Sequence, residues 1–319
     1  MASTDYIIET RGLVKRYGKL TAVNNLSLQV PRGAIYGFVG PNGAGKTTTM
    51  RILTTLITPT QGDAYVAGYS VVDYPREVRR AIGYMPDFFG VYDDMKVWEY
   101  LDFFAACYEI PERERPKLID DLLALVDLTH RRDDMVEKLS RGMKQRLSLA
   151  RTLAHDPEVL ILDEPASGLD PRARIEIREL LVEMARMGKT IFFSSHILAD
   201  VAEICTHLGI IESGEMVAQG TVGEIRRQLM PTREILITLL DRIDDAKETL
   251  LHVPGVESVQ DMPDDHGRKR IRVEFSGDDV SMSEMLRTLS SRGIPVVNFA
   301  EETRDLEAVF RRATKGIVS

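Results

Sequence analysis

A glycine-rich segment between an apolar run and a helical run narrows the choice of fold for this chain. Gly40–Thr48 reads GPNGAGKTT and contains the pattern G-x-x-x-x-G-K-T. It follows the strand-like run Ile35–Val39 and overlaps a helical pattern from Thr47 to about Leu56, which is the context that a phosphate-binding loop needs. Glycines let backbone N–H groups curl around an anion, and the helix N-terminus adds about half a positive charge. The segment therefore predicts a site for the phosphates of a nucleotide.

Two side chains of this loop have specific tasks. Lys46 can reach the β- and γ-phosphates and counts as catalytic, and Thr47 can ligate Mg²⁺. We expect the nucleotide site to be formed by Gly40, Pro41, Asn42, Gly43, Ala44, Gly45, Lys46, Thr47 and Thr48.

A pair of carboxylates follows a second apolar run. Val159–Leu162 (VLIL) is followed directly by Asp163 and Glu164. A carboxylate at the end of a buried strand can hold Mg²⁺, so we assign Asp163 to the metal. Glu164 is placed to polarise an attacking water as a general base. The alternative is a solvated loop, but the apolar run and the phosphate loop favour a nucleotide-hydrolysing site.

Composition and charge exclude several classes of protein. The 319 residues suggest about two domains, and no run reaches the roughly 18 apolar residues of a membrane span. The start shows no secretory signal, and Cys107 and Cys205 are too few for a disulfide framework or a cysteine-built metal site. We expect a cytoplasmic protein. With 41 basic and 49 acidic residues, it lacks the basic footprint of a nucleic-acid binder.

Two regions of the chain differ in pattern. Residues 1–230 alternate short apolar strands with helical patterns, which predicts an α/β fold with a largely parallel sheet. Within them, residues from about 84 to 157 read as a helical subdomain. Residues 231–319 read β-α-β-β-α-β plus a helix at Leu306–Lys315, which predicts a small α+β ferredoxin-like domain. A capping box of Ser281 and Glu284 is expected before its second helix.

Three further segments make the pattern specific: Leu139–Arg146 (LSRGMKQR), Ser167–Asp170 (SGLD) and Ser194–His196 (SSH). Together with the loop and the carboxylates, they resemble the nucleotide-binding domain of ATP-binding cassette (ABC) transporters. The resemblance covers about residues 6–229. It implies a P-loop NTPase cassette, with a RecA-like core, a β-rich edge and a helical subdomain, that binds ATP and Mg²⁺ and hydrolyses ATP.

The resemblance also implies roles for single residues. Tyr17 would stack on adenine, and His196 would be catalytic by contacting the γ-phosphate and helping to hold the attacking water. Ser140 and Gly142 match the signature motif, which binds the ATP held by the opposing subunit. The family therefore implies a head-to-tail homodimer with two ATP molecules buried at its interface, which the loop containing Asp170 crosses.

Two positions depart from the usual family pattern. Asp87 stands where the family usually has a glutamine that helps to bind Mg²⁺ and water. A carboxylate can still ligate Mg²⁺, but it cannot donate a hydrogen bond as an amide does. The signature reads Ser-Arg-Gly-Met instead of Ser-Gly-Gly-Gln, a form that is similar to cassettes of the ABC-2 export type.

This resemblance implies the ATPase subunit of an exporter. The subunit would lie on the cytoplasmic face of the membrane and drive separate transmembrane permease subunits. Phe88, Phe89 and Tyr92 are expected to contribute to the docking surface for a permease helix, and residues 231–319 to act as an accessory or regulatory domain.

Two alternatives remain open at this point. One is a soluble ABC ATPase that acts on nucleic acid or ribosomes. The stretch between Lys46 and Ser140 is too short for a long coiled coil, the chain holds a single cassette, and its charge is acidic, so these features disfavour this class. The other is a weakly hydrolytic, nucleotide-gated regulatory module, towards which only Asp87 and Arg141 point.

Overall fold

The computed structural model describes residues 5–87, 90, 92, 94–197, 201–229, 232–265 and 268–302. It divides into two compact units, one up to Ile225 and one beginning at Arg226. Within the described ranges, no helix combines the length and the apolar character that a membrane span requires. The expected helix at Leu306–Lys315 lies outside the described residues, as do Phe88 and Phe89.

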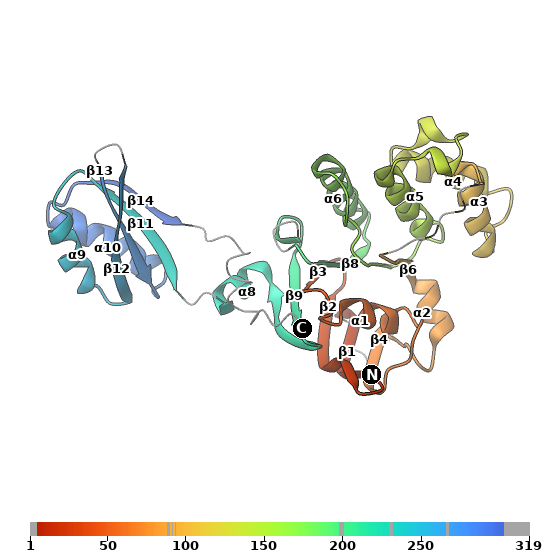
Figure 1. The fold of residues 1–319 in the computed structure, drawn as a ribbon, viewed down its shortest axis with the longest axis horizontal. Helices are drawn as coiled ribbons and strands as arrows, with labels where there is room; N and C mark the ends of the chain where they lie inside the picture. The colour runs from red at the N-terminus through yellow and green to blue at the C-terminus, as the bar shows by residue number, and fades with distance from the viewer. Residues whose placement is uncertain are drawn as a thin grey trace. The chain divides into compact units, whose positions relative to one another are not determined.

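The first unit is built on a largely parallel sheet (Figure 1). Its strand order is β10-β9-β3-β8-β7-β6, and all pairs are parallel except β9 with β10. The two predicted apolar runs, Ile35–Val39 and Val159–Leu162, are confirmed as β3 and β7. The strands are β3 (Ile35–Val39), β6 (Ile82–Met85), β7 (Val159–Leu162), β8 (Thr190–Ser195), β9 (His207–Glu212) and β10 (Glu215–Thr221).

A second, antiparallel sheet of the order β2-β1-β4-β5 forms the β-rich edge of this unit. Its strands are β1 (Tyr6–Tyr17), β2 (Leu20–Pro31), β4 (Gln61–Val66) and β5 (Tyr69–Ser70). The helices α1 (Lys46–Leu53) and α2 (Pro75–Ala81) complete this part of the chain.

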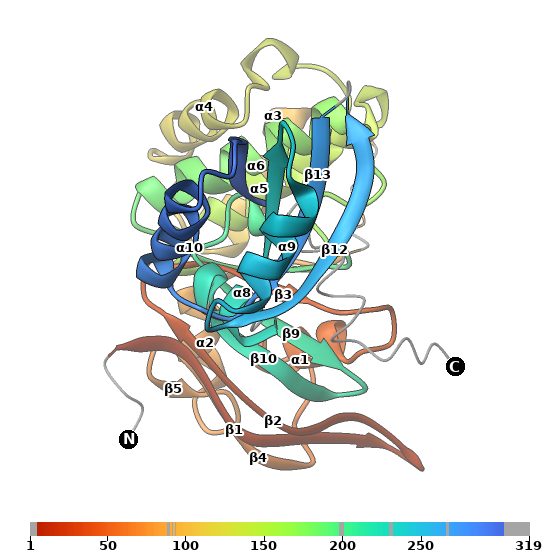
Figure 2. The same cartoon turned by 90° about the vertical axis from the view of Figure 1, so that its left-hand side faces the viewer.

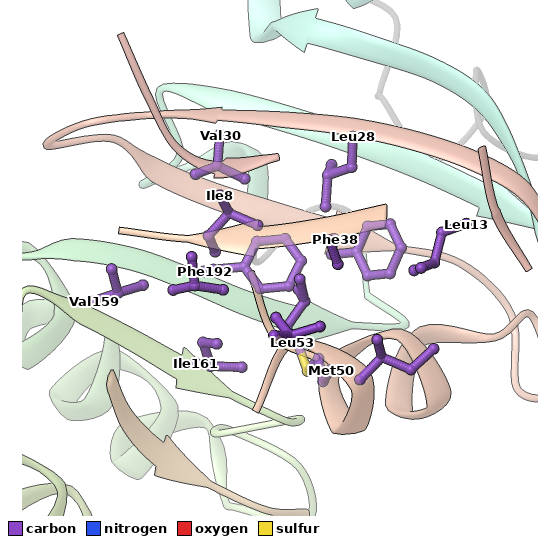
Figure 3. Packing of buried hydrophobic residues seen from close by; sticks show 14 of the residues in the cluster. Ile8, Leu13, Leu28, Val30, Phe38, Met50, Leu53, Val159, Ile161 and Phe192 are labelled. Carbon is purple, nitrogen blue, oxygen red and sulfur yellow. The ribbon is translucent and has the colours of Figure 1, made fainter. Parts of the chain in front are cut away.

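The main core of the first unit joins α1 to both sheets. Figure 3 shows Ile8 and Leu28 of the second sheet, Phe38 and Phe192 of the central sheet, and Met50 of α1 packed together. The ring centroids of Phe38 and Phe192 are 5.4 Å apart. Because α1 is held by this apolar contact, its N-terminus, where the glycine-rich loop ends, has a fixed position.

A helical segment follows β6. It contains α3 (Val97–Cys107), α4 (Arg115–Leu125), η1 (Thr129–Arg131), η2 (Val136–Lys138) and α5 (Arg141–Leu153), and α3, α4 and α5 pack against one another (Figure 1). The first unit also contains α6 (Pro171–Arg186), and α8 (Val222–Leu229) follows β10. Tyr84, where we expected the helical region to begin, is still part of strand β6.

The second unit contains an antiparallel sheet of the order β12-β13-β11-β14. The helices α9 (Ile243–Leu251) and α10 (Asp279–Ser291) lie on one face of this sheet (Figure 2). Ile237, Ile271 and Phe275 are buried in the core between the sheet and these helices. The predicted β-α-β-β-α-β ferredoxin-like order is confirmed. The elements are β11 (Arg233–Leu239), α9 (Ile243–Leu251), β12 (Val256–Asp265), β13 (Arg268–Phe275), α10 (Asp279–Ser291) and β14 (Val296–Glu302).

The capping box predicted for α10 is wrong. Asp278 is the N-cap, and its Oδ1 accepts hydrogen bonds from Ser281 N at 2.9 Å and from Ser281 Oγ at 2.7 Å. Aspartate is as good an N-cap as serine, and here it lies one turn earlier. Ser281 is therefore inside the first turn of the helix.

Candidate active site

The sheet topology brings four of the expected segments to one edge. β3, β8, β7 and β6 are neighbours and run parallel, so their carboxyl ends lie side by side. The residues that follow these ends are Gly40 after β3, His196 after β8, Asp163 after β7 and Asp87 close after β6. In open α/β sheets, ligands bind at this edge.

The loop after β3 needs glycine at two positions. Gly45 has φ +105°, and a Cβ atom there would lie 2.5 Å from the carbonyl oxygen of Ala22. A Cβ atom on Gly40 would lie 2.3 Å from the carbonyl oxygen of Ile211. Gly45 precedes α1 directly, so the loop delivers backbone N–H groups to the positive end of this helix.

The Lys46 ammonium lies inside this loop. Its Nζ donates to the carbonyl oxygens of Gly40 at 2.7 Å and Pro41 at 3.2 Å, and lies 3.6 Å from Glu164 Oε1. Burial lowers the pKa of Lys46, and the Glu164 carboxylate acts in the opposite direction. Negative charge next to a buried ammonium stabilises its charged form, so Lys46 is suited to contact an anion such as a phosphate.

Asp163 is buried, with only 1% of its surface exposed. Its Oδ1 accepts a hydrogen bond from Ser194 Oγ at 2.7 Å, but Oδ2 is buried and has no hydrogen-bond partner in the described part of the chain. Leaving a buried carboxylate oxygen unpaired is costly. A cation bound to this oxygen would remove that cost.

Glu164 and His196 form a contact pair next to Lys46. His196 Nδ1 lies 2.9 Å from Glu164 Oε2. Glu164 has φ +51°, which is uncommon for a residue with a side chain, and its N–H donates to Ser194 Oγ at 2.9 Å. One carboxylate is therefore held between a lysine and a histidine, an arrangement suited to a general base.

Asp87 is exposed but lies within electrostatic reach of the other carboxylates. Partial desolvation raises its pKa, and the nearby Asp163 and Glu164 carboxylates raise it further. Arg141 and His196 act in the opposite direction. A bound cation would relieve the repulsion among these three carboxylates.

The signature residues Ser140 and Gly142 line a cavity that lies apart from the glycine-rich loop. This cavity of about 230 Å³ includes Ser140 and Gly142 at the start of α5, together with residues 168–170 and the first two turns of α6. None of residues 40–48 is in its lining. Ser140 is the N-cap of α5 and accepts a hydrogen bond from Met143 N at 3.3 Å.

The remaining expected residues flank the loop or end a strand. Thr47 and Thr48 are half-buried in the first turn of α1. Tyr17 ends β1, is 46% exposed, and has Lys15 Nζ 5.2 Å from its ring centroid. The exposed part of this ring could stack on another aromatic ring.

The structure adds three residues that we did not assign to the site. Ser194 joins Asp163 to Glu164, the buried Gln145 donates from Nε2 to the carbonyl oxygen of Pro165, and Arg141 Nη2 donates to Ser167 O at 3.2 Å. Ser194 had a detectable signal, because it belongs to the segment Ser194–His196 that stands out in the sequence. The other two contacts join segments whose proximity only the fold reveals.

Comparison with known proteins places this geometry in a family. Residues 23–167 match the ABC transporter family model, and residues 220–314 match the model of the C-terminal domain of DrrA1-3-like ATP-binding proteins. An ABC transporter ATP-binding protein of Synechocystis sp. is 39% identical over 209 residues, which are 65% of this chain and 58% of that protein.

Two further similarities extend this result. A Nod factor export ATP-binding protein of Ralstonia nicotianae is 36% identical over 257 residues, 76% of this chain and 80% of that protein. A solved structure of an ATP-binding subunit of an ABC transporter is 32% identical, with a TM-score of 0.63, and the match covers 70% of this chain and 92% of that one. The chain therefore belongs to the ABC transporter family, as one of its ATP-binding, ATP-hydrolysing subunits.

Proposed function

We propose that the chain is the ATPase subunit of an exporter and works as a head-to-tail homodimer. One observation carries this proposal: Lys46, Asp163, Glu164 and His196 gather at the edge of the sheet, whereas Ser140 lines a separate cavity. A second copy would present its own Ser140 and Gly142 to the ATP held by the first. Each reaction centre would then be completed by the partner.

In this proposal, the loop and Lys46 bind the phosphates, and the exposed ring of Tyr17 stacks on adenine. Glu164 takes a proton from the attacking water, which then attacks the γ-phosphorus, and the bond to the β-phosphate oxygen breaks. His196, 2.9 Å from the Glu164 carboxylate, orients this base and can donate to the γ-phosphate. ADP and inorganic phosphate leave, and the loss of the γ-phosphate opens the dimer.

The donor set at the sheet edge suits Mg²⁺. Thr47, Asp163 and Asp87 would hold the ion, and Asp163 Oδ2 is the buried oxygen that needs a partner. The described residues contain no group of three or more His, Cys, Asp or Glu side chains that could hold a metal by themselves. Mg²⁺ is usually bound by one or two carboxylates plus phosphate oxygens. When bound, it would neutralise charge that develops on the phosphates.

The relatives of this chain support the proposal that it serves an exporter. The Ralstonia nicotianae protein is named for Nod factor export, and the C-terminal match is to a DrrA1-3-like domain. We assign residues 1–230 to the nucleotide-binding domain and residues 231–319 to an accessory or regulatory domain. The cassette would lie on the cytoplasmic face of the membrane, bound to separate permease subunits and not to nucleic acid.

An aromatic surface is available for such a partner. Tyr92 and Phe103 are 53% and 39% exposed, and their ring centroids are 5.6 Å apart. Aromatic side chains are common anchors of protein interfaces. We assign the permease contact to this part of the helical segment.

The test is an ATPase assay of the purified chain with and without Mg²⁺. Lys46→Ala should abolish turnover and weaken ATP binding, because it removes the buried cation. Glu164→Gln should abolish turnover but leave ATP binding within about threefold, because the loop is intact. The exposed Lys117→Ala on α4 is the control. Normal turnover by Lys46→Ala would reject the assigned site.

A further inference from the structure

We infer that Ser194 is a positioning residue that fixes both carboxylates of the reaction centre. This inference rests on the proposed function, because it concerns the metal ligand and the base of that reaction. Ser194 is fully buried near the end of β8. Its Oγ lies 2.7 Å from Asp163 Oδ1 and 2.9 Å from the backbone nitrogen of Glu164.

The direction of these two hydrogen bonds follows from the donors available. The Glu164 N–H can only donate, so Ser194 Oγ must accept there. A serine hydroxyl has one proton and two acceptor lone pairs, so its proton is free for Asp163 Oδ1. This second bond is charge-assisted, and therefore strong, when Asp163 is ionised. Both contacts can be made at once by one hydroxyl.

The bond to Asp163 decides which carboxylate oxygen stays available. With Oδ1 engaged, the buried Oδ2 is the oxygen without a partner. The hydroxyl thus holds the carboxylate in one rotamer, with Oδ2 ready for a cation. Partners that hydrogen-bond to metal ligands in this way typically affect metal affinity by about 10- to 100-fold.

The bond to Glu164 holds its backbone in an unusual conformation. Glu164 has φ +51°, a region that residues with side chains occupy only when neighbouring groups hold them there. The same residue places its carboxylate 2.9 Å from His196 Nδ1 and 3.6 Å from Lys46 Nζ. Ser194 lies in β8 and His196 follows the strand directly, so this segment positions the base both through a backbone contact and through a side-chain contact.

The experiment measures metal affinity separately from turnover. The protein is saturated with a non-hydrolysable ATP analogue and titrated with Mn²⁺, read by electron paramagnetic resonance, and analogue binding is also measured in EDTA. Ser194→Ala should weaken Mn²⁺ binding by about tenfold or more and change analogue binding in EDTA by less than about twofold. Ser194→Thr keeps the hydroxyl and should restore Mn²⁺ affinity to within about threefold.

Ser148→Ala is the matched control. Ser148 is also fully buried, but its Oγ has no hydrogen-bond partner among the described residues, so this variant should bind Mn²⁺ like the wild type. Mn²⁺ affinity of Ser194→Ala within about twofold of the wild type would overturn the inference, as would an equal loss in Ser148→Ala. A wild-type protein that binds no nucleotide would instead overturn the proposed function.

Discussion

At the scale of single residues, the site gathers negative charge around one buried ammonium. The carboxylates of Asp87, Asp163 and Glu164 lie within electrostatic reach of one another, and Lys46 Nζ lies 3.6 Å from Glu164 Oε1. Such repulsion is tolerated in a folded protein when a ligand of opposite charge later occupies the site. Asp87 contributes to this repulsion through its negative charge, whereas an amide side chain at the same position would carry no charge.

The charge of Asp87 has a consequence for stability. Its pKa is raised in the folded protein, so the folded state binds the proton more tightly, and stability falls as the pH rises through this pKa. We predict that Asp87→Asn melts at a higher temperature than the wild type at pH 7. The difference should shrink below about pH 4, where Asp87 is protonated in both states.

Thermal melts between about pH 3 and pH 8 measure this effect, with the exposed Asp94→Asn as the control. A melting temperature of Asp87→Asn that is equal to or below that of the wild type at pH 7 would contradict the assigned repulsion.

At the scale of elements, a buried contact joins α5 to the loop that carries Glu164. Gln145 of α5 is 3% exposed, and its Nε2 donates to the carbonyl oxygen of Pro165. Gln145→Ala should lower the free energy of unfolding by about 1–3 kcal/mol, because it leaves a buried carbonyl oxygen without a donor.

Chemical denaturation measures this loss. Gln219→Ala, which removes an exposed 3.4 Å hydrogen bond to Ser27 O, should cost less than about 0.5 kcal/mol. Equal losses of unfolding free energy in the two variants would show that the contact of Gln145 with Pro165 contributes no more to stability than an exposed hydrogen bond does.

The elements also show what a sequence can predict. β3, β7 and β8 are buried, short and apolar, so their composition identifies them, and a glycine loop and two carboxylates follow two of them. The role of Ser194 was not predicted, because its two partners follow another strand, β7, and meet it only in the folded sheet. The start of α10 was misplaced because Asp278 and Ser281 are both good N-caps, and the choice between them depends on local geometry.

At the scale of the whole molecule, the chain consists of two compact units with separate cores. Only the first contains the assigned nucleotide site. We predict that calorimetry resolves two unfolding transitions. A non-hydrolysable ATP analogue with Mg²⁺ should raise the midpoint temperature of only one transition, because a ligand stabilises the unit that binds it. A single transition that shifts as a whole would contradict independent units.

In the proposed homodimer, one chain holds only part of each reaction centre. The most direct measurement is the mass of Glu164→Gln in solution with ATP, by light scattering, with and without the added substitution Ser140→Glu. We expect twice the mass of one chain for Glu164→Gln. We expect a return to a single chain, with unchanged ATP affinity, when Ser140→Glu places a negative charge against the partner's ATP. Two results would contradict this arrangement: full ATP hydrolysis by the wild-type protein as a monomer, or a Glu164→Gln dimer that Ser140→Glu leaves intact.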